Sequence, residues 1–161
     1  MPVKSKVNGT NGLDVLNLAI LRALSRDPRM SMSALGRAVG LSAPAVTERV
    51  QRLESSGVIR GYRLDIDPAA LGLPVAAWVR IKPGPGQLMK LAELAASLPE
   101  VVECHRITGE DCFLAKIHVS GVDQLETVLD RFLLFGQTVS SIVQSSPVPP
   151  RDLPLPADPR T

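Results

Sequence analysis

The spacing of apolar residues changes once along this chain, and the change limits the folds that the chain can adopt. Between Leu13 and Leu53 apolar residues recur at steps of three and four, which is the period of amphipathic helices. From Pro74 onward, alternating segments typical of strands are interleaved with two further helical stripes. We therefore expect an α+β chain in which a helical domain precedes a mixed one.

Three helices are predicted in residues 13–57, which we treat as the first domain. The first helix begins at Leu13 and stops before Pro28, because proline cannot continue a helix. Ser33 is expected to cap a short second helix, and Gly40 to end it in the left-handed conformation.

The third helix follows the second after only the turn Gly40-Leu41-Ser42, a spacing typical of the helix-turn-helix motif. In that motif the second of the two helices enters the major groove of DNA. Val46 and Val50 begin its inner stripe, so hydroxyl, small and guanidinium side chains remain outside to meet bases and phosphates. The candidate DNA-binding residues are Ser42, Pro44, Ala45, Thr47, Glu48, Arg49, Arg52, Arg60 and Arg63.

The charges are divided unevenly, which suits a polyanionic partner such as double-stranded DNA. Residues 1–63 hold ten Lys and Arg against four Asp and Glu, a net charge of +6, whereas residues 64–161 hold eight against twelve, a net charge of −4. No stretch approaches the roughly 18 apolar residues of a membrane span, and the first residues lack the apolar run of a signal peptide. With only two cysteines, we expect a cytoplasmic protein without a disulfide framework.

A second domain is predicted over residues 73–146, after a linker strand and connection in residues 58–72. Its patterns follow the order strand, helix, strand, strand, helix, strand, which corresponds to a ferredoxin-like βαββαβ unit. The expected strands are 74–82, 101–107, 112–119 and 138–144, and the expected helices are 87–97 and 122–135. Residues 1–12 are expected to be flexible, and residues 147–161, which hold six of the fourteen prolines, to be disordered.

The sheet of such a domain has helices on one face only, so its other face requires a partner. We expect Val75, Ala77 and Val79 to lie on the uncovered face. Burying that face against a second sheet predicts a homo-oligomer.

Several short stretches between Leu13 and about Ser145 together form a specific pattern. They are Leu13-Asp14 with Ile20-Leu21, Val39-Gly40-Leu41-Ser42, Val46 with Arg49-Val50 and Leu53-Glu54, Gly57 to Tyr62, Thr108 to Asp111, and Phe135 to Thr138 leading to Ser141-Ile142-Val143. In these stretches the sequence resembles the leucine-responsive regulatory protein/AsnC (Lrp/AsnC) family of transcription regulators. Asn17 stands where the family often has Asp, and Gly36 where it usually has Ala. Because a glycine inside a helix costs about 1 kcal/mol relative to alanine, we expect a looser helical domain.

The resemblance implies a function and a second binding site. Members bind operator DNA through the helix-turn-helix and pair through a C-terminal domain of the RAM type, forming dimers that often assemble into tetramers or octamers. Their usual effectors are amino acids bound between C-terminal domains, although Val139 departs from the family pattern and leaves the effector unidentified. Carried over, Gly109 would allow close approach and Asp111 would meet an ammonium group. The expected effector-binding residues are Thr108, Gly109, Glu110, Asp111, Thr138 and Ser140.

Two other functions remain consistent with the same fold. An architectural protein would bind DNA without any effector, and some lineages of this fold resemble tetrapyrrole decarboxylases that have lost DNA binding. Here the basic third helix is present, and His105 and His118 have no carboxylate or cysteine at ligand spacing, so we expect no enzyme activity, no cofactor and no metal. Cys104 and Cys112 are expected to be small buried hydrophobic residues.

Overall fold

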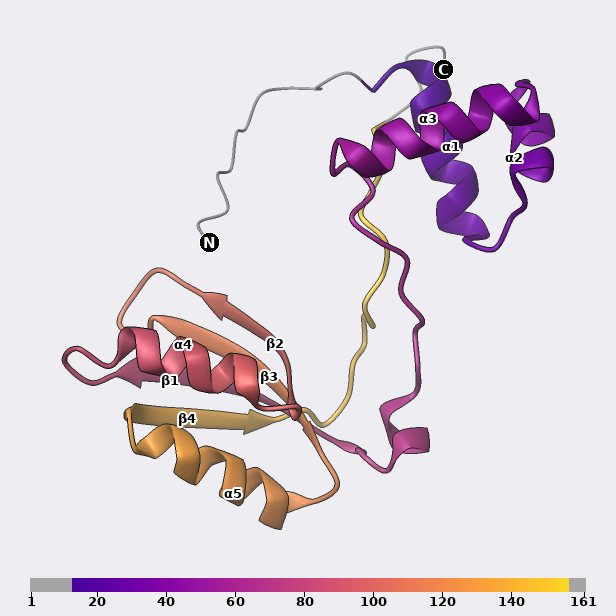
Figure 1. Cartoon of the computed structure of the whole chain (residues 1–161). Coiled ribbons are helices and arrows are strands. Elements are labelled where there is room, and N and C mark those ends of the chain that lie inside the picture. The colour runs from indigo at the N-terminus through magenta and orange to yellow at the C-terminus, as the bar shows by residue number, and fades with distance from the viewer. Residues whose placement is uncertain (1–12, 157–161) are drawn as a thin grey trace. The chain divides into compact units, whose positions relative to one another are not determined.

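The computed structural model describes residues 13–156, and these divide into two units. One unit contains residues 13–64 together with 150–156, and the other contains Asp65–Pro149. The first holds three helices and the second a βαββαβ arrangement (Figure 1), which confirms the α+β fold class. Residues 1–12, expected to be flexible, lie outside the described part. Within the described range, no helix is long and apolar enough to cross a membrane.

The first unit is built from three capped helices around a small aliphatic core. Asp14, Ser31 and Ser42 cap the helices, and each side chain accepts a hydrogen bond from the backbone N–H three residues later. The helices are α1 (Val15–Arg26), α2 (Met32–Val39) and α3 (Ala43–Ser55). The buried core consists of Ile20, Leu24, Leu35, Val46, Val50 and Leu53.

The second helix begins two residues earlier than the sequence indicates. Its cap is Ser31 rather than Ser33: Ser31 Oγ lies 3.2 Å from the backbone nitrogen of Ala34, whereas Ser33 is an exposed residue within the helix. The earlier start brings Met32 against the core. The predicted end is confirmed, because Gly40 closes the helix with a φ of 73°.

Gly36 allows α2 and the following turn to approach each other closely. It is buried, and a Cβ atom at this position would lie 2.7 Å from the carbonyl oxygen of Leu41. The conformational freedom of glycine predicts a looser helical unit, because ordering a glycine costs entropy on folding. The close packing that Gly36 permits between α2 and the turn offsets part of this entropy cost.

The linker is not a strand, so the prediction for Val58 to Asp67 is wrong. These residues have no regular secondary structure, and a short 3-10 helix, η1 (Pro68–Leu71), follows them. The apolar residues of the segment remain exposed: Leu64 is 85% exposed and Ile66 is 50% exposed. No strand of the described chain pairs with this segment, and an alternating pattern without a pairing partner does not make a strand.

The second unit is a four-stranded antiparallel sheet with two helices packed on one face (Figure 1). The strand order is β2-β3-β1-β4, so β2 and β4 are the edge strands. The predicted order of elements is confirmed, and the last strand begins and ends two residues earlier than expected. The elements are β1 (Val75–Pro83), α4 (Leu88–Ser97), β2 (Val101–Arg106), β3 (Phe113–Val119), α5 (Val122–Leu133) and β4 (Gly136–Ile142).

The two faces of the sheet carry the opposite residues from those predicted. Val75, Ala77 and Val79 do not lie on the uncovered face: Ala77 and Val79 are fully buried against α4 and α5, and Val75 packs on the same cluster. The alternate residues, Trp78 and Arg80 among them, point to the uncovered face. The start of β1 is apolar on both faces, so strand alternation alone does not decide which set the helices cover.

The C-terminal segment returns to the first unit. Within the described part, residues 144–156 contain no helix or strand, and those from Pro150 onward belong to the helical unit. Arg22 of α1 donates a hydrogen bond to the carbonyl oxygen of Pro156, with an N–O distance of 2.5 Å. Residues 147–161 were predicted to be disordered. The structure describes this segment as far as Pro156.

We predict that Gly136→Ala lowers the free energy of unfolding by about 1–3 kcal/mol, the usual cost of overpacking a well-packed site. Gly136 pairs with Pro83 where β4 meets β1, and an added Cβ would overlap the carbonyl oxygen of Lys82 and the Cα of Pro83. Because these are backbone atoms, the two strands must separate. Urea unfolding followed by circular dichroism measures the difference.

Gly84→Ala is the matched control. A Cβ at Gly84 would lie 3.5 Å from the carbonyl oxygen of Phe135, which is an ordinary contact distance. Equal stabilities for Gly136→Ala and Gly84→Ala would show that the close approach of β1 and β4 is not the constraint.

Candidate nucleic-acid interface

The exposed side of α3 is the candidate surface for DNA. Pro44, Glu48 and Arg52 are exposed on it, and Ala45 and Thr47 are half-buried beside them. Arg52 Nη2 lies 2.5 Å from Glu48 Oε1, an ion pair one helical turn apart. The hydroxyl of Thr47 donates to the backbone carbonyl one turn earlier at 2.8 Å. The surface therefore presents small groups near the start of the helix and paired charges further along.

The N-terminal end of α3 is suited to a phosphate. Ser42 Oγ lies 3.4 Å from the backbone nitrogen of Ala45 and caps the helix. Free N–H groups and the positive end of the helix dipole meet at such an end, and both attract an anion. Pro44 stands in the first turn, where it has no N–H to leave unpaired.

Arg49 points toward α1 rather than into solvent. Its Nη1 lies 2.6 Å from Asp14 Oδ2 and 3.0 Å from Asn17 Oδ1, and only 28% of its side chain is exposed. The sequence predicts an outward-facing Arg49 because the residue lies outside the inner stripe of α3. In the structure the long side chain reaches across to the start of α1, so the guanidinium helps to fix the angle between the two helices.

Asp14 links the start of α1 to α3. One carboxylate oxygen accepts the backbone N–H of Asn17 at 2.7 Å, and the other pairs with Arg49. The backbone hydrogen bond from Asn17, and after it the Arg49 guanidinium, outweigh partial burial and lower the pKa of the Asp14 carboxyl below its ordinary value of 3.8. Asp14 was not among the predicted functional residues, although its position directly before a helical stripe is typical of a cap.

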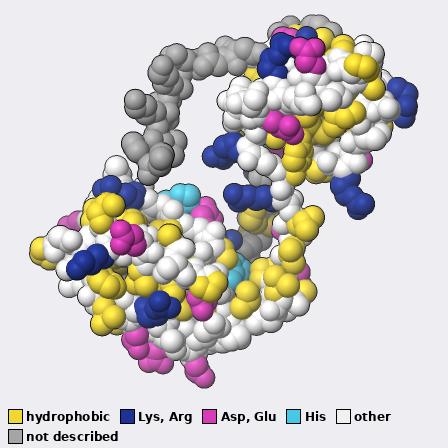
Figure 2. Space-filling model, in the orientation of Figure 1, with side chains coloured by type: hydrophobic (Ala, Val, Ile, Leu, Met, Phe, Trp, Pro, Cys, Tyr) yellow, Lys and Arg dark blue, Asp and Glu magenta, His cyan; other side chains and the backbone are white. Residues whose placement is uncertain are grey.

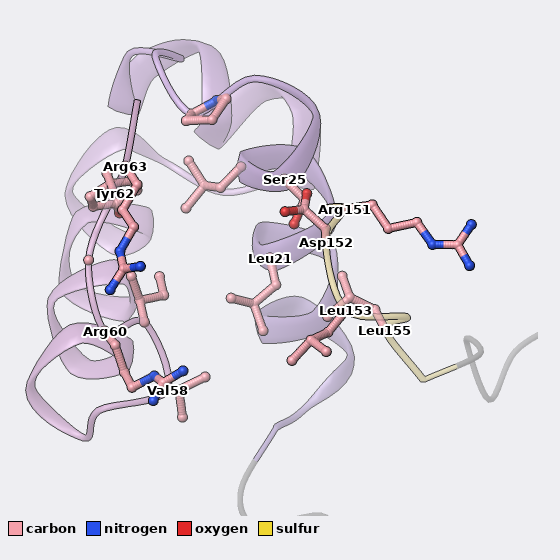
Figure 3. A pocket seen from close by; sticks show the side chains of 14 residues that line it. Leu21, Ser25, Val58, Arg60, Tyr62, Arg63, Arg151, Asp152, Leu153 and Leu155 are labelled. Carbon is pink, nitrogen blue, oxygen red and sulfur yellow. The ribbon is translucent and has the colours of Figure 1, made fainter. Parts of the chain in front are cut away.

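Arg60 and Arg63 lie beyond α3, on the rim of a groove in the helical unit (Figure 3). Both are exposed, as a contact to a DNA phosphate requires. Tyr62 between them donates its hydroxyl to Glu54 Oε1 at 3.1 Å. Burial, followed by the neighbouring Glu54 carboxylate, raises the pKa of the Tyr62 phenol.

Basic side chains are spread around the helical unit, whereas Asp and Glu gather along the lower edge of the sheet unit in the view of Figure 2. Several exposed arginines of the helical unit are absent from the predicted set, and Arg37 is the one beside the turn of the motif. Arg37 lies in the last turn of α2, just before the turn of the motif. Arg37 was not predicted because the helix-turn-helix pattern assigns the DNA contacts to the third helix and the residues that follow it.

The loop between β2 and β3 holds four of the six predicted effector residues. A backbone hydrogen bond of 2.8 Å between residues 107 and 112 joins its two ends. Gly109 has a φ of 111°, a conformation that residues with a side chain rarely adopt. Thr108 and Glu110 are exposed at the tip, and Asp111 is half-buried.

Two cations of β1 contact the carboxylates of this loop. Arg80 Nη1 lies 3.6 Å from Asp111 Oδ2, and Lys82 Nζ lies 3.2 Å from Glu110 Oε2. Neither cation was among the predicted site residues, although their alternation with buried aliphatic residues in β1 indicates an uncovered face. Each of the two adjacent carboxylates thus has a cation of its own.

Thr138 and Ser140 lie on β4, on the other side of β1 from the loop. Ser140 pairs with Val79, and Val139 pairs with Arg80. Because directly paired residues of antiparallel strands point to the same face, Thr138 and Ser140 lie on the helix-covered side and Val139 on the side of Arg80. Within one chain, the two parts of the predicted effector set do not meet on a common face.

The cysteines and histidines differ from expectation in two details. Cys104 is exposed and Cys112 half-buried, so neither is a fully buried hydrophobic residue, and burial raises the pKa of the Cys104 thiol even so. His105 does have a carboxylate neighbour, since its Nε2 lies 2.6 Å from Glu103 Oε1 on the same face of β2. Among residues 13–156 no group of three or more His, Cys, Asp or Glu is arranged to hold a metal ion.

Comparisons with known proteins match both units. Residues 13–54 match the AsnC-type helix-turn-helix domain, and residues 76–153 match the Lrp/AsnC ligand binding domain. The chain is 36% identical over 133 residues to the HTH-type transcriptional regulator LrpC of Bacillus subtilis, covering 83% of this chain and 92% of that protein. It is 34% identical over 134 residues to the leucine-responsive regulatory protein of Haemophilus influenzae, covering 81% of each. These matches confirm the resemblance found in the sequence.

Solved structures agree with the sequence matches. The structure of LrpC from Bacillus subtilis has a TM-score of 0.79 at 36% identity and covers 83% of this chain and 95% of that one. A feast or famine regulatory protein from Mycobacterium tuberculosis, complexed with L-methionine, has a TM-score of 0.83 at 33% identity and covers 89% of this chain and 99% of that one. The curated relatives named above are transcriptional regulators and not enzymes, which confirms that expectation for the chain.

We predict that Asp14→Ala destabilises the helical unit more than Asp14→Asn. Alanine removes both the cap of α1 and the ion pair with Arg49, whereas asparagine keeps the cap and removes only the charge. Loss of an N-cap costs about 0.5–2 kcal/mol, and loss of an exposed ion pair about 0.2–1 kcal/mol. Thermal unfolding of the full chain measures both. Equal losses would show that Asp14 does not act as a cap.

The contribution of the Asp14 charge has a defined pH dependence. Because folding lowers the pKa of this carboxyl, its charge stabilises the folded state above 3.8, and the stabilisation is lost as the pH falls through the lower pKa of the folded state. The stability difference between the natural chain and Asp14→Asn should therefore shrink below pH 3.8. A difference that stays constant in acid would assign the effect to something other than the charge.

Proposed function

The chain belongs to the Lrp/AsnC family of DNA-binding transcriptional regulators, and from this premise we propose that it binds operator DNA as a homodimer, through the exposed side of α3, under the control of an amino acid. The proposal is supported above all by the capped α3, on which Pro44, Glu48 and Arg52 are exposed. We propose the cytoplasm as its location, where such a regulator meets DNA.

At the DNA, the start of α3 and its exposed side take different roles. Pro44 and Ala45 are small and apolar, as contact with a thymine methyl requires. Arg52 extends from the same side and can exchange Glu48 for a base edge or a phosphate. Arg60 and Arg63 lie farther along the chain and are assigned to phosphates. Ser42 and Thr47 complete the candidate contacts, and Arg49 acts as a positioning residue through α1.

A homodimer would present two copies of α3 to half-sites about one helical turn of DNA apart. The uncovered face of the sheet is the proposed pairing surface. On it Trp78 and Leu114 are half-buried, and Lys116 Nζ lies 5.9 Å from the centre of the Trp78 ring. Aromatic and aliphatic groups with charges around them are typical of protein interfaces. Assembly of such dimers into tetramers or octamers would use other surfaces.

Arg80 and Asp111 form the proposed recognition pair for an amino-acid effector. An amino acid is a zwitterion, so its carboxylate suits the Arg80 guanidinium and its ammonium suits the Asp111 carboxylate. The 3.6 Å between the two side chains is longer than a hydrogen bond, so a ligand displaces only a loose contact. Gly109 leaves the loop without a side chain at its bend.

The remaining effector candidates are proposed to contact the side chain of the ligand, or to contact a ligand bound at a second subunit. Thr108 and Glu110 lie at the loop tip, and Thr138 and Ser140 lie on β4. An amino-acid effector is also supported by the related protein from Mycobacterium tuberculosis, whose structure contains L-methionine.

We predict that Arg52→Ala weakens binding to operator DNA by about 1–3 kcal/mol, the usual cost of losing an arginine contact to a base. Thermal stability should change little, because the exposed pair with Glu48 contributes little to folding. Fluorescence anisotropy with duplexes selected from a random library, repeated at several salt concentrations, measures the affinity and its salt dependence.

The control for Arg52 is Arg131→Ala, which removes an exposed arginine from the last turn of α5 in the sheet unit. Equal losses of affinity from the two variants would contradict a specific role for α3. An affinity of the natural chain for DNA that does not change with salt concentration would contradict the proposed DNA-binding surface as a whole.

We predict that an amino acid raises the melting temperature of the chain and that Asp111→Asn removes this effect. At one hundred times its dissociation constant a ligand stabilises by about 2.7 kcal/mol, which corresponds to several degrees for a unit of this size. L-Methionine and the other nineteen amino acids are tested by thermal shift. Asp130→Asn, which makes the same change at an exposed carboxylate of α5 outside the candidate site, should keep the shift. A chain that responds to none of the twenty would be an effector-independent architectural protein.

A further inference from the structure

The two units are joined by two connections, because the chain crosses back to the helical unit after the sheet. The first connection leaves the helical unit after Leu64, and the second returns at Pro150. The backbone N–H of Val143 still donates to the carbonyl of Ala76 at 2.8 Å, so the second connection consists only of residues 144–149. Two of these six residues are prolines, which makes the connection short and partly stiff.

After this connection the chain runs beside α1, and residues 151–153 and 155 form one wall of the groove (Figure 3). Leu155 is half-buried, whereas Leu153 is 84% exposed. Both leucines line the groove together with Leu21 of α1. The hydrogen bond from Arg22 to the carbonyl of Pro156 fixes the far end of the segment. The segment is thus held by one apolar anchor and one polar contact.

The proline content of this segment lowers the conformational entropy that it loses when it docks. Pro154 and Pro156 fix the φ angle at two of the six positions in the segment 151–156, and Pro150 does so directly before it, so much of the segment is extended before it docks. Grooves that recognise extended proline-rich segments commonly contain an aromatic side chain, and Tyr62 lines this one. A tether as short as residues 144–149 keeps the segment at an effective concentration on the order of millimolar, so contacts of modest affinity are occupied.

We propose that residues 151–156 form a strap that docks beside α1 and gives the DNA-binding unit a second attachment to the sheet unit. With the linker after Leu64 alone, the unit can reorient about a single connection. A docked strap closes a second connection and removes much of that freedom. No residue of α3 lines the groove, so the strap restricts the orientation of the DNA-binding unit while leaving α3 itself open; Arg60 and Arg63 are exposed on the groove's rim.

The test compares Leu155→Ser with Leu153→Ser in the full chain by ¹⁵N relaxation, without DNA or effector. In the natural chain, the amides of residues 152, 153 and 155 should have order parameters close to the 0.85 or so of a rigid backbone, and Leu155→Ser should lower them below about 0.6. The same variant should shorten the rotational correlation time of the helical unit relative to the sheet unit. Leu153→Ser makes the same chemical change at an exposed position and should alter neither quantity. Both positions lie outside the buried cores, so both variants fold.

Four results would overturn the proposal. Residues 152–155 that are as mobile as a free terminus in the natural chain would show that no strap docks. Equal effects of Leu155→Ser and Leu153→Ser would show that the half-buried leucine is not the anchor. If the strap is ordered but its release leaves the tumbling of the helical unit unchanged, the strap does not act as a second attachment. Order that appears only at high protein concentration would assign the groove to the strap of a second copy instead.

Discussion

Burial of alternate side chains of β1 under α4 and α5 determines which side chains the uncovered face of the sheet exposes for binding. Val79 and Ile81 are fully buried there, so strand alternation directs Trp78, Arg80 and Lys82 to the uncovered face. The same strand lies next to β3, whose preceding loop carries the carboxylates that these cations meet. A slip of one residue in β1 would place two cations in the core and lose both the proposed pairing surface and the proposed effector pair.

The sequence predicted the elements of the fold wherever a single residue decides a boundary. Gly40 ends α2 and Ser42 begins α3, because few residues satisfy those positions as well. Prediction failed where two solutions meet the same local rule. Ser31 and Ser33 are both good caps, and packing of the residue between them against the core selects the earlier one. The alternating pattern of 58–67 was equally ambiguous, since a strand exists only when another strand pairs with it.

The candidate sites depended more on tertiary contacts and were predicted less completely. Side-chain chemistry and helical spacing were enough to propose α3 for DNA, but the direction of Arg49 depends on how closely α1 approaches α3. Asp14 therefore gained a role only in the structure. In the sheet unit, the pairing of Arg80 with Asp111 follows from the register of β1 against β3, which a single sequence does not reveal. The helical unit has only six buried core residues. In so small a core, polar links such as the Arg49–Asp14 pair contribute substantially to fixing α3 relative to α1.

The proposed effector pair and the proposed strap are connected through β4. Arg80 pairs with Val139 in β4, and β4 continues through residues 144–149 into the strap beside α1. As an edge strand, β4 is held by hydrogen bonds to β1 alone, so a displacement of β1 reaches it without crossing another strand. A ligand can shift an equilibrium only by binding two states with different affinity. The docked and released strap are two such states, and they differ in the freedom of the DNA-binding unit. Under these two proposals, a ligand that parts Arg80 from Asp111 would act on β1, the strand that holds β4, and through β4 on the connection to the strap.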